Sequence, residues 1–468
     1  MAASYEFRPG PRLVVGPGTL TRLGDLARGL GAARALVTSD PGIVAAGHTA
    51  AGVAALEAAG LVTAVFSAFG ENPSTDEVEA GTALAREFRP DLLVGLGGGS
   101  SMDCAKGINF LVSRGGRMED HKGRGRPGPP LLPSIAVPTT AGTGSETQSF
   151  ALITDAASGM KMACGDPAAA FRVAILDVEL TLTQPPRVAA TTGVDAVAHA
   201  VESFVSTAAT PASRMLAREA WRLLAANLPL VLAGATGRAE HVGPHHEARA
   251  AVQLGAAWAG LAIENSMLGA AHALANPLTA AHGTVHGQAV GLALPHVVRF
   301  NAPAVERAYA ELLAAGGMPA AEGRAAVNLA AWLDDLLAAA GLGRSLGAIG
   351  IVTPDIPALA AAAATQWTGG FNPRPWHDAR LRHAPRPQPA APGVAGDGRP
   401  IAWHGHPGRG RPRRGPCRCL AAGPRLARRH GPLCRPAQTA PGRGLAARLR
   451  QDGLRNRAGD RRGRCVRG

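Results

Sequence analysis

One aspartate and three histidines form two blocks whose spacing suits metal binding. Asp195 and His199 are four residues apart, and His272 and His286 are fourteen apart in a second block. On a helix, residues four apart share one face, so Asp195 and His199 can reach the same ion. One carboxylate and three imidazoles are suitable ligands for a divalent first-row metal such as iron or zinc. The alternative is that these are scattered core or surface histidines, of which the chain has others, such as His245.

A glycine-rich segment upstream predicts a phosphate-binding loop. Gly97, Gly98, Gly99, Ser100 and Ser101 end an apolar run and precede a segment with helical spacing. Glycines let the backbone approach a phosphate closely, and the start of a helix presents free N–H groups to it. The alternative is a tight turn at a strand end, which needs fewer glycines and serines. The segment is not a G-x-G-x-x-G fingerprint, so an ordinary Rossmann interpretation does not follow.

A second loop repeats this arrangement after the next apolar run. Thr139, Thr140, Thr143 and Ser145 surround two glycines there. Their hydroxyls can bond phosphate or ribose oxygens. The alternative is a Ser/Thr-rich loop with a helix cap, and the first glycine loop favours the binding interpretation.

Asp40 follows an earlier apolar run and precedes Pro41-Gly42. A carboxylate at the end of a strand can accept hydrogen bonds from a ribose diol and repel a 2′-phosphate, which favours NAD over NADP. The alternative is a cap for a helix or turn.

Short apolar runs alternate with helical segments in the first part of the chain. This alternation predicts a mostly parallel sheet covered by helices. The predicted strands are 35–38, 62–66, 91–96 and 134–137, and the predicted helices include 45–59 and 75–88.

The pattern changes after about residue 185, where long Ala/Leu-rich segments have helical spacing. These segments are 187–206, 211–233, 245–275, 302–316 and 321–340. We therefore predict an α/β dinucleotide-binding domain over 1–184 and an all-helical metal and substrate domain over 185–375. Pro185-Pro186 marks the boundary.

The last 93 residues differ in composition from the rest. Residues 376–468 contain 22 Arg, no Lys and four Asp, a net charge of +18, whereas 1–375 have a net charge of −4. Arg, Pro and Gly make up 49 of the 93 residues, and no hydrophobic period is present. We predict a disordered basic tail. GC-rich DNA read in another frame yields this composition, so a reading-frame change is the favoured explanation of the tail. A nucleic-acid-binding arm is the less favoured alternative, because aromatic residues for stacking are scarce.

The cysteines and the lengths of the apolar runs indicate the cellular compartment. Cys104 and Cys164 are isolated cysteines in the first 375 residues and give no disulfide framework. The first residues contain no apolar signal region, and no apolar run approaches the length of a membrane span. We expect a cytoplasmic protein with no membrane partner.

Together these motifs resemble the iron-containing (group III) alcohol dehydrogenase family, which has a dehydroquinate synthase-like fold. The resemblance covers about residues 5–375. It includes Phe7-Arg-Pro, Gly16-Pro-Gly18, Asp40-Pro-Gly, Asn72-Pro73, both glycine loops, Lys161, Asp177, Gly193–Glu202, Val285–Gly291, Leu294–His296 and Gln366–Pro375.

The resemblance implies a two-domain enzyme in which NAD(P) and a metal meet between the domains. By position, the metal ligands correspond to Asp195, His199, His272 and His286. The dinucleotide contacts correspond to Asp40, Asn72, Gly97, Gly98, Gly99, Ser100, Ser101, Asp103, Thr139, Thr140, Thr143, Ser145 and Lys161. Fe²⁺ is the metal that the family favours, and the ligand types also accept Zn²⁺.

The implied activity is that of a metal-dependent NAD(P)-linked alcohol dehydrogenase. The metal would act as a Lewis acid on the oxygen of an alcohol, aldehyde or ketone, and hydride would pass between substrate and nicotinamide. One alternative is a dehydroquinate synthase-type lyase that uses NAD and zinc, and another is nucleic-acid binding through the tail. The sequence leaves a homo-oligomer open.

Two features depart from the family. Many members have a second histidine four residues after the third ligand, often assigned to proton transfer, and here that residue is Asn276. An amide cannot exchange a proton near pH 7, so water, His282 or another group would relay it. The family also continues with a short final helix, whereas the Arg-rich segment begins here.

Overall fold

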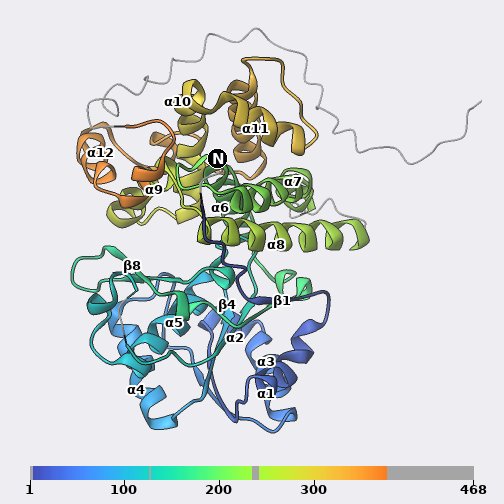
Figure 1. Cartoon of the computed structure of the whole chain (residues 1–468), viewed down its shortest axis with the longest axis vertical. Coiled ribbons are helices and arrows are strands. Elements are labelled where there is room, and N and C mark those ends of the chain that lie inside the picture. The colour runs from blue at the N-terminus through green and yellow to red at the C-terminus, as the bar shows by residue number, and fades with distance from the viewer. Residues whose placement is uncertain (1–3, 126–127, 235–241, 377–468) are drawn as a thin grey trace, which may run out of the picture. The chain divides into compact units, whose positions relative to one another are not determined.

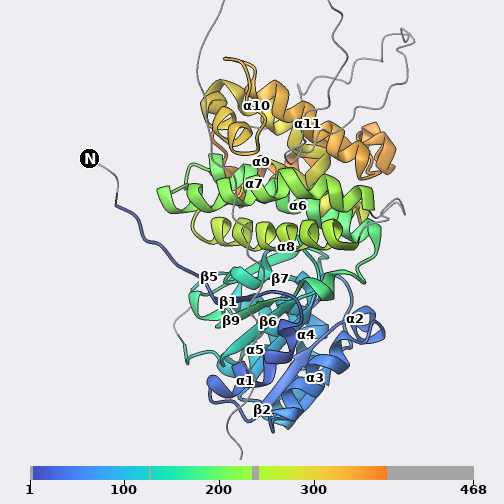
Figure 2. The same cartoon turned by 90° about the vertical axis from the view of Figure 1, so that its right-hand side faces the viewer.

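The computed structural model describes residues 4–125, 128–234 and 242–376 (Figures 1 and 2). The predicted basic tail lies outside the described residues from position 377 onward. Within the described ranges, no helix combines the length and the apolarity that crossing a membrane requires.

A six-stranded parallel sheet forms the first part of the chain, as predicted. Its strand order is β1-β9-β6-β4-β2-β3, and every neighbouring pair is parallel. The strands are β1 (Arg12–Val15), β2 (Arg34–Thr38), β3 (Val62–Phe66), β4 (Leu92–Gly97), β6 (Ser134–Pro138) and β9 (Val173–Leu176). Because β6, β4 and β2 are adjacent and parallel, their carboxyl ends meet at one edge, where open α/β sheets bind ligands.

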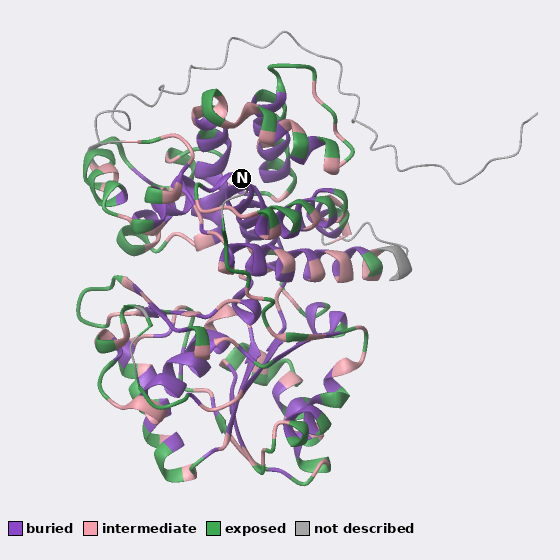
Figure 3. Cartoon of the chain, viewed as in Figure 1, coloured by how far each residue is buried: buried purple, intermediate pink, exposed green. Residues whose placement is uncertain are grey.

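Helices cover both faces of this sheet. They are α1 (Leu23–Gly29), α2 (Pro41–Ala45), α3 (His48–Ala58), α4 (Thr75–Phe88) and α5 (Gly99–Arg114). Ala35 and Val37 belong to the core that contains α1 and α3, and Leu36 belongs to the core that contains α4 and α5. This alternation follows from the two-residue period of a strand. The central strands are buried on both faces (Figure 3).

A second, three-stranded sheet was not predicted. Its order is β5-β8-β7, from β5 (Gly123–Arg124), β8 (Lys161–Gly165) and β7 (Phe150–Thr154). Strand β8 has a weak sequence signal, because Lys161, Ala163 and Gly165 are not strand-forming types. The sequence analysis also missed the edge strand β1 and the strand β9.

The second part of the chain is helical, as predicted. Its helices are α6 (Pro186–Val205), α7 (Pro211–Ala233), α8 (Val242–Glu264), α9 (Ala270–His282), α10 (His286–Ala315), α11 (Ala325–Ala339) and α12 (Ile356–Ala364). The prediction of one helix over 245–275 was wrong. Helix α8 ends at Glu264, and the next residue, Asn265, exchanges two hydrogen bonds with the backbone of Arg8. Helix α12 was missed because its run of alanines has no polar–apolar period.

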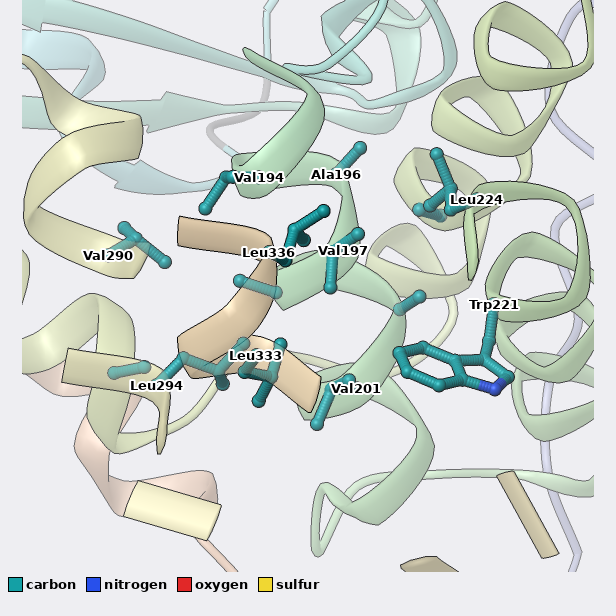
Figure 4. Packing of buried hydrophobic residues seen from close by; sticks show 14 of the residues in the cluster. Val194, Ala196, Val197, Val201, Trp221, Leu224, Val290, Leu294, Leu333 and Leu336 are labelled. Carbon is teal, nitrogen blue, oxygen red and sulfur yellow. The ribbon is translucent and has the colours of Figure 1, made fainter. Parts of the chain in front are cut away.

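One large hydrophobic core holds the helical part together. Val194, Val197 and Val201 on α6 pack among residues of α7, α10 and α11, including Trp221 and Leu294 (Figure 4). The core residues of α6 recur at the three- and four-residue spacing of one helix face. The remaining face of α6 carries the polar residues of the site described next.

Candidate active site

The two glycine-rich loops meet at the carboxyl edge of the parallel sheet. The amide of Thr139 donates to the carbonyl of Gly97 at 2.9 Å, which joins the ends of β6 and β4. A Cβ atom on Gly99 would lie 2.9 Å from the Thr143 side chain. The loops therefore contact each other directly, and the absence of a side chain at position 99 permits this contact.

The first loop opens helix α5. Gly97 has φ of +149° and Gly98 is the N-terminal cap of the helix. A side chain at Gly97 would collide with Ser101. Position 97 therefore requires glycine for its backbone conformation and for space. The start of α5 then presents N–H groups at the sheet edge, an arrangement suited to an anion.

Two hydroxyls of the second loop are buried and lack partners. Among the described residues, none forms a hydrogen bond with Oγ1 of Thr139 or of Thr140. Buried hydroxyls are normally hydrogen-bonded, so unpartnered ones beside a glycine loop suit a polar ligand. The residues thus fit a dinucleotide phosphate or ribose.

Asp40 caps a helix and also reaches the first glycine loop. Its Oδ1 accepts from the amides of Gly42 and Ile43, and its Oδ2 accepts from the hydroxyl of Ser101 at 3.2 Å. The structure confirms the helix-cap interpretation of Asp40, and the contact with a ribose stays a prediction. The backbone N–H of Asn72, which follows β3, donates to the hydroxyl of Ser100 at 3.1 Å.

The remaining predicted residues are Asp103, Lys161 and Ser145 of the second loop. Ser145 donates to Oδ1 of Asp103 at 2.7 Å, and both side chains are buried. Burial lowers the pKa of Lys161, and the negative charges of Asp103 and Asp195 oppose this. Lys161 therefore lies within electrostatic range of both sites.

Three of the four predicted metal ligands, the histidines, converge on a carboxylate oxygen of the fourth, Asp195. Oδ1 of Asp195 lies 3.5 Å from Nε2 of His199, 3.4 Å from Nε2 of His272 and 3.9 Å from Nε2 of His286. Helix α6 supplies Asp195 and His199, α9 supplies His272, and His286 is the first residue of α10. The ligand atoms of Asp195, His272 and His286 all lie within 4.8 Å of one another.

These atoms pass a test for metal binding. Ligands at about 2.1 Å from a tetrahedral metal are about 3.4 Å apart. The distances from Asp195 to His272 and His199, 3.4 and 3.5 Å, are close to this value, and the 3.9 Å to His286 is longer. Asp195 Oδ1 and His272 Nε2 are buried, and within the described ranges neither has a hydrogen-bond partner. Buried acceptors without donors are unfavourable unless a ligand satisfies them. The donor set and its spacing therefore fit a divalent cation.

The role of Glu202 was not predicted from the sequence. Its Oε2 accepts from Nδ1 of His272 at 2.6 Å, and its Oε1 accepts from the amide of Ala271 at 2.7 Å. A carboxylate on one ring nitrogen holds the proton there and leaves the other nitrogen free for a metal. The signal was available, because Asp195, His199 and Glu202 follow one another at helical spacing on α6.

The charges of the cluster favour metal binding. Burial alone would raise the pKa of Asp195, but the surrounding imidazoles keep it well below its usual range. Burial lowers the pKa of His199, and it lowers that of His286 to about 3. For His272, the carboxylates of Asp195 and Glu202 outweigh burial and raise the pKa to about 9. A bound cation would replace the proton on Nε2 of His272, which faces Asp195, while Glu202 keeps the proton on Nδ1.

The two candidate relay residues lie in different surroundings. Asn276 is one turn beyond His272 on α9, and its Nδ2 donates to Oε1 of Gln366 at 3.0 Å. His282 is ten residues beyond His272, about 15 Å along a helix, and its Nε2 is 3.8 Å from Asp355. The described structure does not bring His282 to the metal ligands.

Helix α8 connects the two parts of the site. Thr147, after the second loop, donates its hydroxyl to the carbonyl of Ala257 at 3.1 Å. Ser149 donates its amide and its hydroxyl to the carboxylate of Glu264 at 2.8–3.0 Å. These bonds attach the segment that follows the second loop to the helical part that carries the metal ligands.

Glycine loops on a parallel sheet, together with an aspartate–histidine metal cluster on helices, define a metal-dependent dinucleotide enzyme. Residues 10–178 match the family described as iron-containing alcohol dehydrogenase, and residues 189–382 match the C-terminal part of the Fe-containing alcohol dehydrogenase family. The chain belongs to the iron-containing alcohol dehydrogenase family. It is a metal-dependent, NAD-linked alcohol dehydrogenase.

Several characterised proteins are similar to this chain. The NAD-dependent methanol dehydrogenase of Bacillus methanolicus is 34% identical over 64% of this chain and 77% of its own length. The lactaldehyde reductase of Escherichia coli (strain K12) is 32% identical over 77% of this chain and 93% of its own length. The crystal structure of a 1,3-propanediol oxidoreductase is 30% identical, with a TM-score of 0.77 over 82% of this chain and 99% of that one.

Proposed function

We propose that Asp195, His199, His272 and His286 hold Fe²⁺, with Zn²⁺ as the other candidate, and that this site oxidises a small alcohol or reduces the corresponding aldehyde or ketone. The observation that carries the proposal is the convergence of three imidazole nitrogens on Oδ1 of Asp195 within 3.4–3.9 Å. In this proposal, residues 1–184 form the dinucleotide-binding domain that carries the loops, and residues 185–375 form the helical domain that carries this cluster. The boundary is at Pro185-Pro186.

The residues have separate tasks. A bound divalent metal would polarise the substrate oxygen as a Lewis acid. Glu202 keeps the proton of His272 on Nδ1, so that Nε2 faces the cation. A nicotinamide dinucleotide would exchange hydride with the substrate carbon. The loops at Gly97–Ser101 and Thr139–Ser145 bind and orient it through backbone N–H groups and hydroxyls.

The activity is tested with primary alcohols and NAD. Protein loaded with Fe²⁺ should produce NADH steadily, and removal of the metal with a chelator should stop it. Metal-dependent turnover of a sugar phosphate without net NADH would instead support a lyase of the dehydroquinate synthase type. The names of the relatives support small alcohols and aldehydes as substrates.

A cytoplasmic location is part of the proposal. Cys104 and Cys164 are both buried and free, which is compatible with a reducing compartment.

We predict that Asp40→Asn relaxes the preference for NAD over NADP. Asparagine remains a good helix cap, so the bonds to Gly42 and Ile43 survive. The substitution removes the negative charge that would repel a 2′-phosphate. A charge contact near the surface contributes on the order of 1–2 kcal/mol, so the ratio of kcat/KM for NAD to that for NADP should fall about 5- to 30-fold. An unchanged ratio, or a wild-type enzyme that prefers NADP, would place Asp40 away from the adenosine ribose.

We predict that Asn276→His introduces a titrating group beside the substrate. Asn276 orients a neighbour through its bond to Gln366 but cannot carry a proton near pH 7. Histidine has a reference pKa near 6.5, so the pH profile of kcat should gain an inflection close to neutrality. Asn276→Gln is the matched control and should add none.

The same measurement separates Asn276 from His282. His282→Ala should leave the kcat profile unchanged, because the ring lies far along α9 and pairs with Asp355. A large loss of kcat in His282→Ala would restore His282 as the proton relay.

A further inference from the structure

Three aromatic side chains form a cluster to which neither the metal nor the dinucleotide assignment gives a role. The ring centroid of Trp367 lies 6.2 Å from that of Phe150 and 6.0 Å from that of Phe371. Aromatic rings that interact have centroids about 4.5–7 Å apart, so Trp367 contacts both neighbours. Phe150 is the first residue of β7, whereas the other two rings belong to the 3₁₀ helix η9 (Trp367–Phe371). The cluster therefore combines one ring from the second sheet with two rings from the helical part.

The segment that carries η9 lies along the turn of α9 that bears His272. At one end of this segment, Oε1 of Gln366 accepts from Nδ2 of Asn276 at 3.0 Å. At the other end, Oδ1 of Asn372 accepts from the backbone N–H of Ala270 at 3.4 Å. Ala270 is two residues before His272 and Asn276 is four residues after it. The segment is thus attached to α9 on both sides of a metal ligand.

These attachments place the indole within reach of a substrate at the metal. One helical turn rises about 5.4 Å, and the hydrogen bond between Asn276 and Gln366 adds 3.0 Å, so Trp367 is on the order of 10 Å from the metal ligands. A primary alcohol that carries an aromatic ring extends roughly 6–9 Å from its oxygen, and ring contact adds about 3.5–4 Å. The two lengths agree.

The neighbours of Trp367 are fixed, while the indole itself is open. A Cβ atom on Gly165 would collide with the ring of Phe150, so this ring lies directly on the backbone of β8. The carbonyl of Phe371 accepts from the amide of Thr207 at 2.9 Å. Trp367 is nevertheless 48% exposed. A single exposed tryptophan can be an ordinary surface residue, but this one is attached beside the metal ligands.

The chemistry of the cluster selects among substrate tails. Its three side chains carry no charge, and the indole N–H is the one hydrogen-bond donor among them. A carboxylate, phosphate or sulfonate tail needs a cation or several donors, which these side chains do not supply. Aromatic rings attract one another through offset or edge-to-face contacts in addition to the apolar area that they bury. The cluster therefore suits a neutral aromatic ring better than a charged tail or a short aliphatic chain.

We propose that Trp367, supported by Phe150 and Phe371, binds the ring of an aromatic primary alcohol or of the corresponding aldehyde, and that this class is the preferred substrate. The inference rests on the proposed function, in which the metal holds the substrate oxygen. Trp367 determines specificity by contact with the ring and takes no part in hydride transfer.

The test compares benzyl alcohol with propan-1-ol in the full-length, Fe²⁺-loaded protein at saturating NAD. In wild type, kcat/KM for benzyl alcohol should exceed that for propan-1-ol about 10-fold or more. Trp367→Leu keeps an apolar side chain and removes the ring, so this ratio should fall about 10-fold, mainly through KM for benzyl alcohol. Trp367→Phe keeps a ring and should hold the ratio within about threefold of wild type. Bound metal and the rate with propan-1-ol should change little in both variants.

Phe88→Leu is the matched control, because it removes a ring at the opposite edge of the main sheet. Phe88 ends α4, and its ring lies 4.4 Å from the guanidinium of Arg34, the first residue of β2. The metal and dinucleotide residues lie at the other edge, so the ratio of the two alcohols should stay at the wild-type value.

Phe150→Leu covers the case in which Trp367→Leu does not fold, and it should lower the ratio as well. A wild-type ratio near or below 1 would overturn the inference. An unchanged ratio in either folded leucine variant would also overturn it, as would failure of both variants to fold. Fe²⁺-loaded wild type that produces NADH from neither alcohol would overturn the proposed function instead.

Discussion

His272→Ala is expected to lose most of the bound metal and to reduce kcat/KM about 10³-fold or more. The substitution removes one of four ligands and leaves Asp195 and Glu202 as buried carboxylates without the imidazole between them. Polarisation of the substrate oxygen by a metal contributes several kcal/mol to catalysis, and each 1.4 kcal/mol is a factor of ten. Metal analysis of the purified variant and steady-state rates measure the two effects.

The control for this prediction is a histidine outside the cluster. His246 lies on α8, and His246→Ala should keep both metal and activity. Binding of NADH by His272→Ala should persist, because the glycine loops lie on the sheet rather than on α9. Stoichiometric metal in His272→Ala, or in the parallel variant His199→Ala, would exclude these residues as ligands.

The sequence predicted those parts of the site that depend on local spacing. Asp195 and His199 are four residues apart on one helix, so their shared direction follows from helix geometry alone. The glycine loops likewise lie where a strand turns into a helix, and the strands β2, β4 and β6 were predicted from their apolar runs. Such features depend on residues close in sequence.

The contacts between distant segments could not be derived from the sequence alone. Glu202 and His272 are separated by 70 residues, and Ser149 and Glu264 by 115. Their approach depends on how α6, α8 and α9 pack, which no local periodicity determines. The arrangement of β7 and β8 was missed for a similar reason, since these strands are stabilised by pairing with each other rather than by a strong apolar pattern.

Asp40 shows why a single residue can support two interpretations. One carboxylate oxygen caps α2, and the other reaches the first glycine loop. A helix cap and a ligand contact both require a carboxylate at the carboxyl end of a strand. The sequence therefore could not separate them; the structure shows the cap, and the contact with a ribose stays a prediction.

The second large effect is expected at Glu202. Substitution by glutamine should weaken metal binding about 10- to 100-fold, the usual consequence of losing a carboxylate behind a metal-ligating histidine. Glutamine has one oxygen, whereas Glu202 accepts from both Ala271 and His272. If the oxygen stays on the Ala271 amide, the glutamine NH₂ faces Nδ1 of His272. The ring must then carry its proton on Nε2, where the metal would bind.

Competition with a chelator of known affinity measures this effect in Glu202→Gln. Glu219→Gln is a suitable control, because Glu219 is half-buried on α7, which carries none of the proposed ligands, and the ion pair and side-chain hydrogen bonds described for it are with Arg222. Circular dichroism should show that both variants are folded. The reduced affinity should be accompanied by a matching loss of activity at limiting metal, with recovery of most activity at high metal concentration. Unchanged metal affinity in Glu202→Gln would mean that the 2.6 Å contact with His272 does not control which ring nitrogen carries the proton.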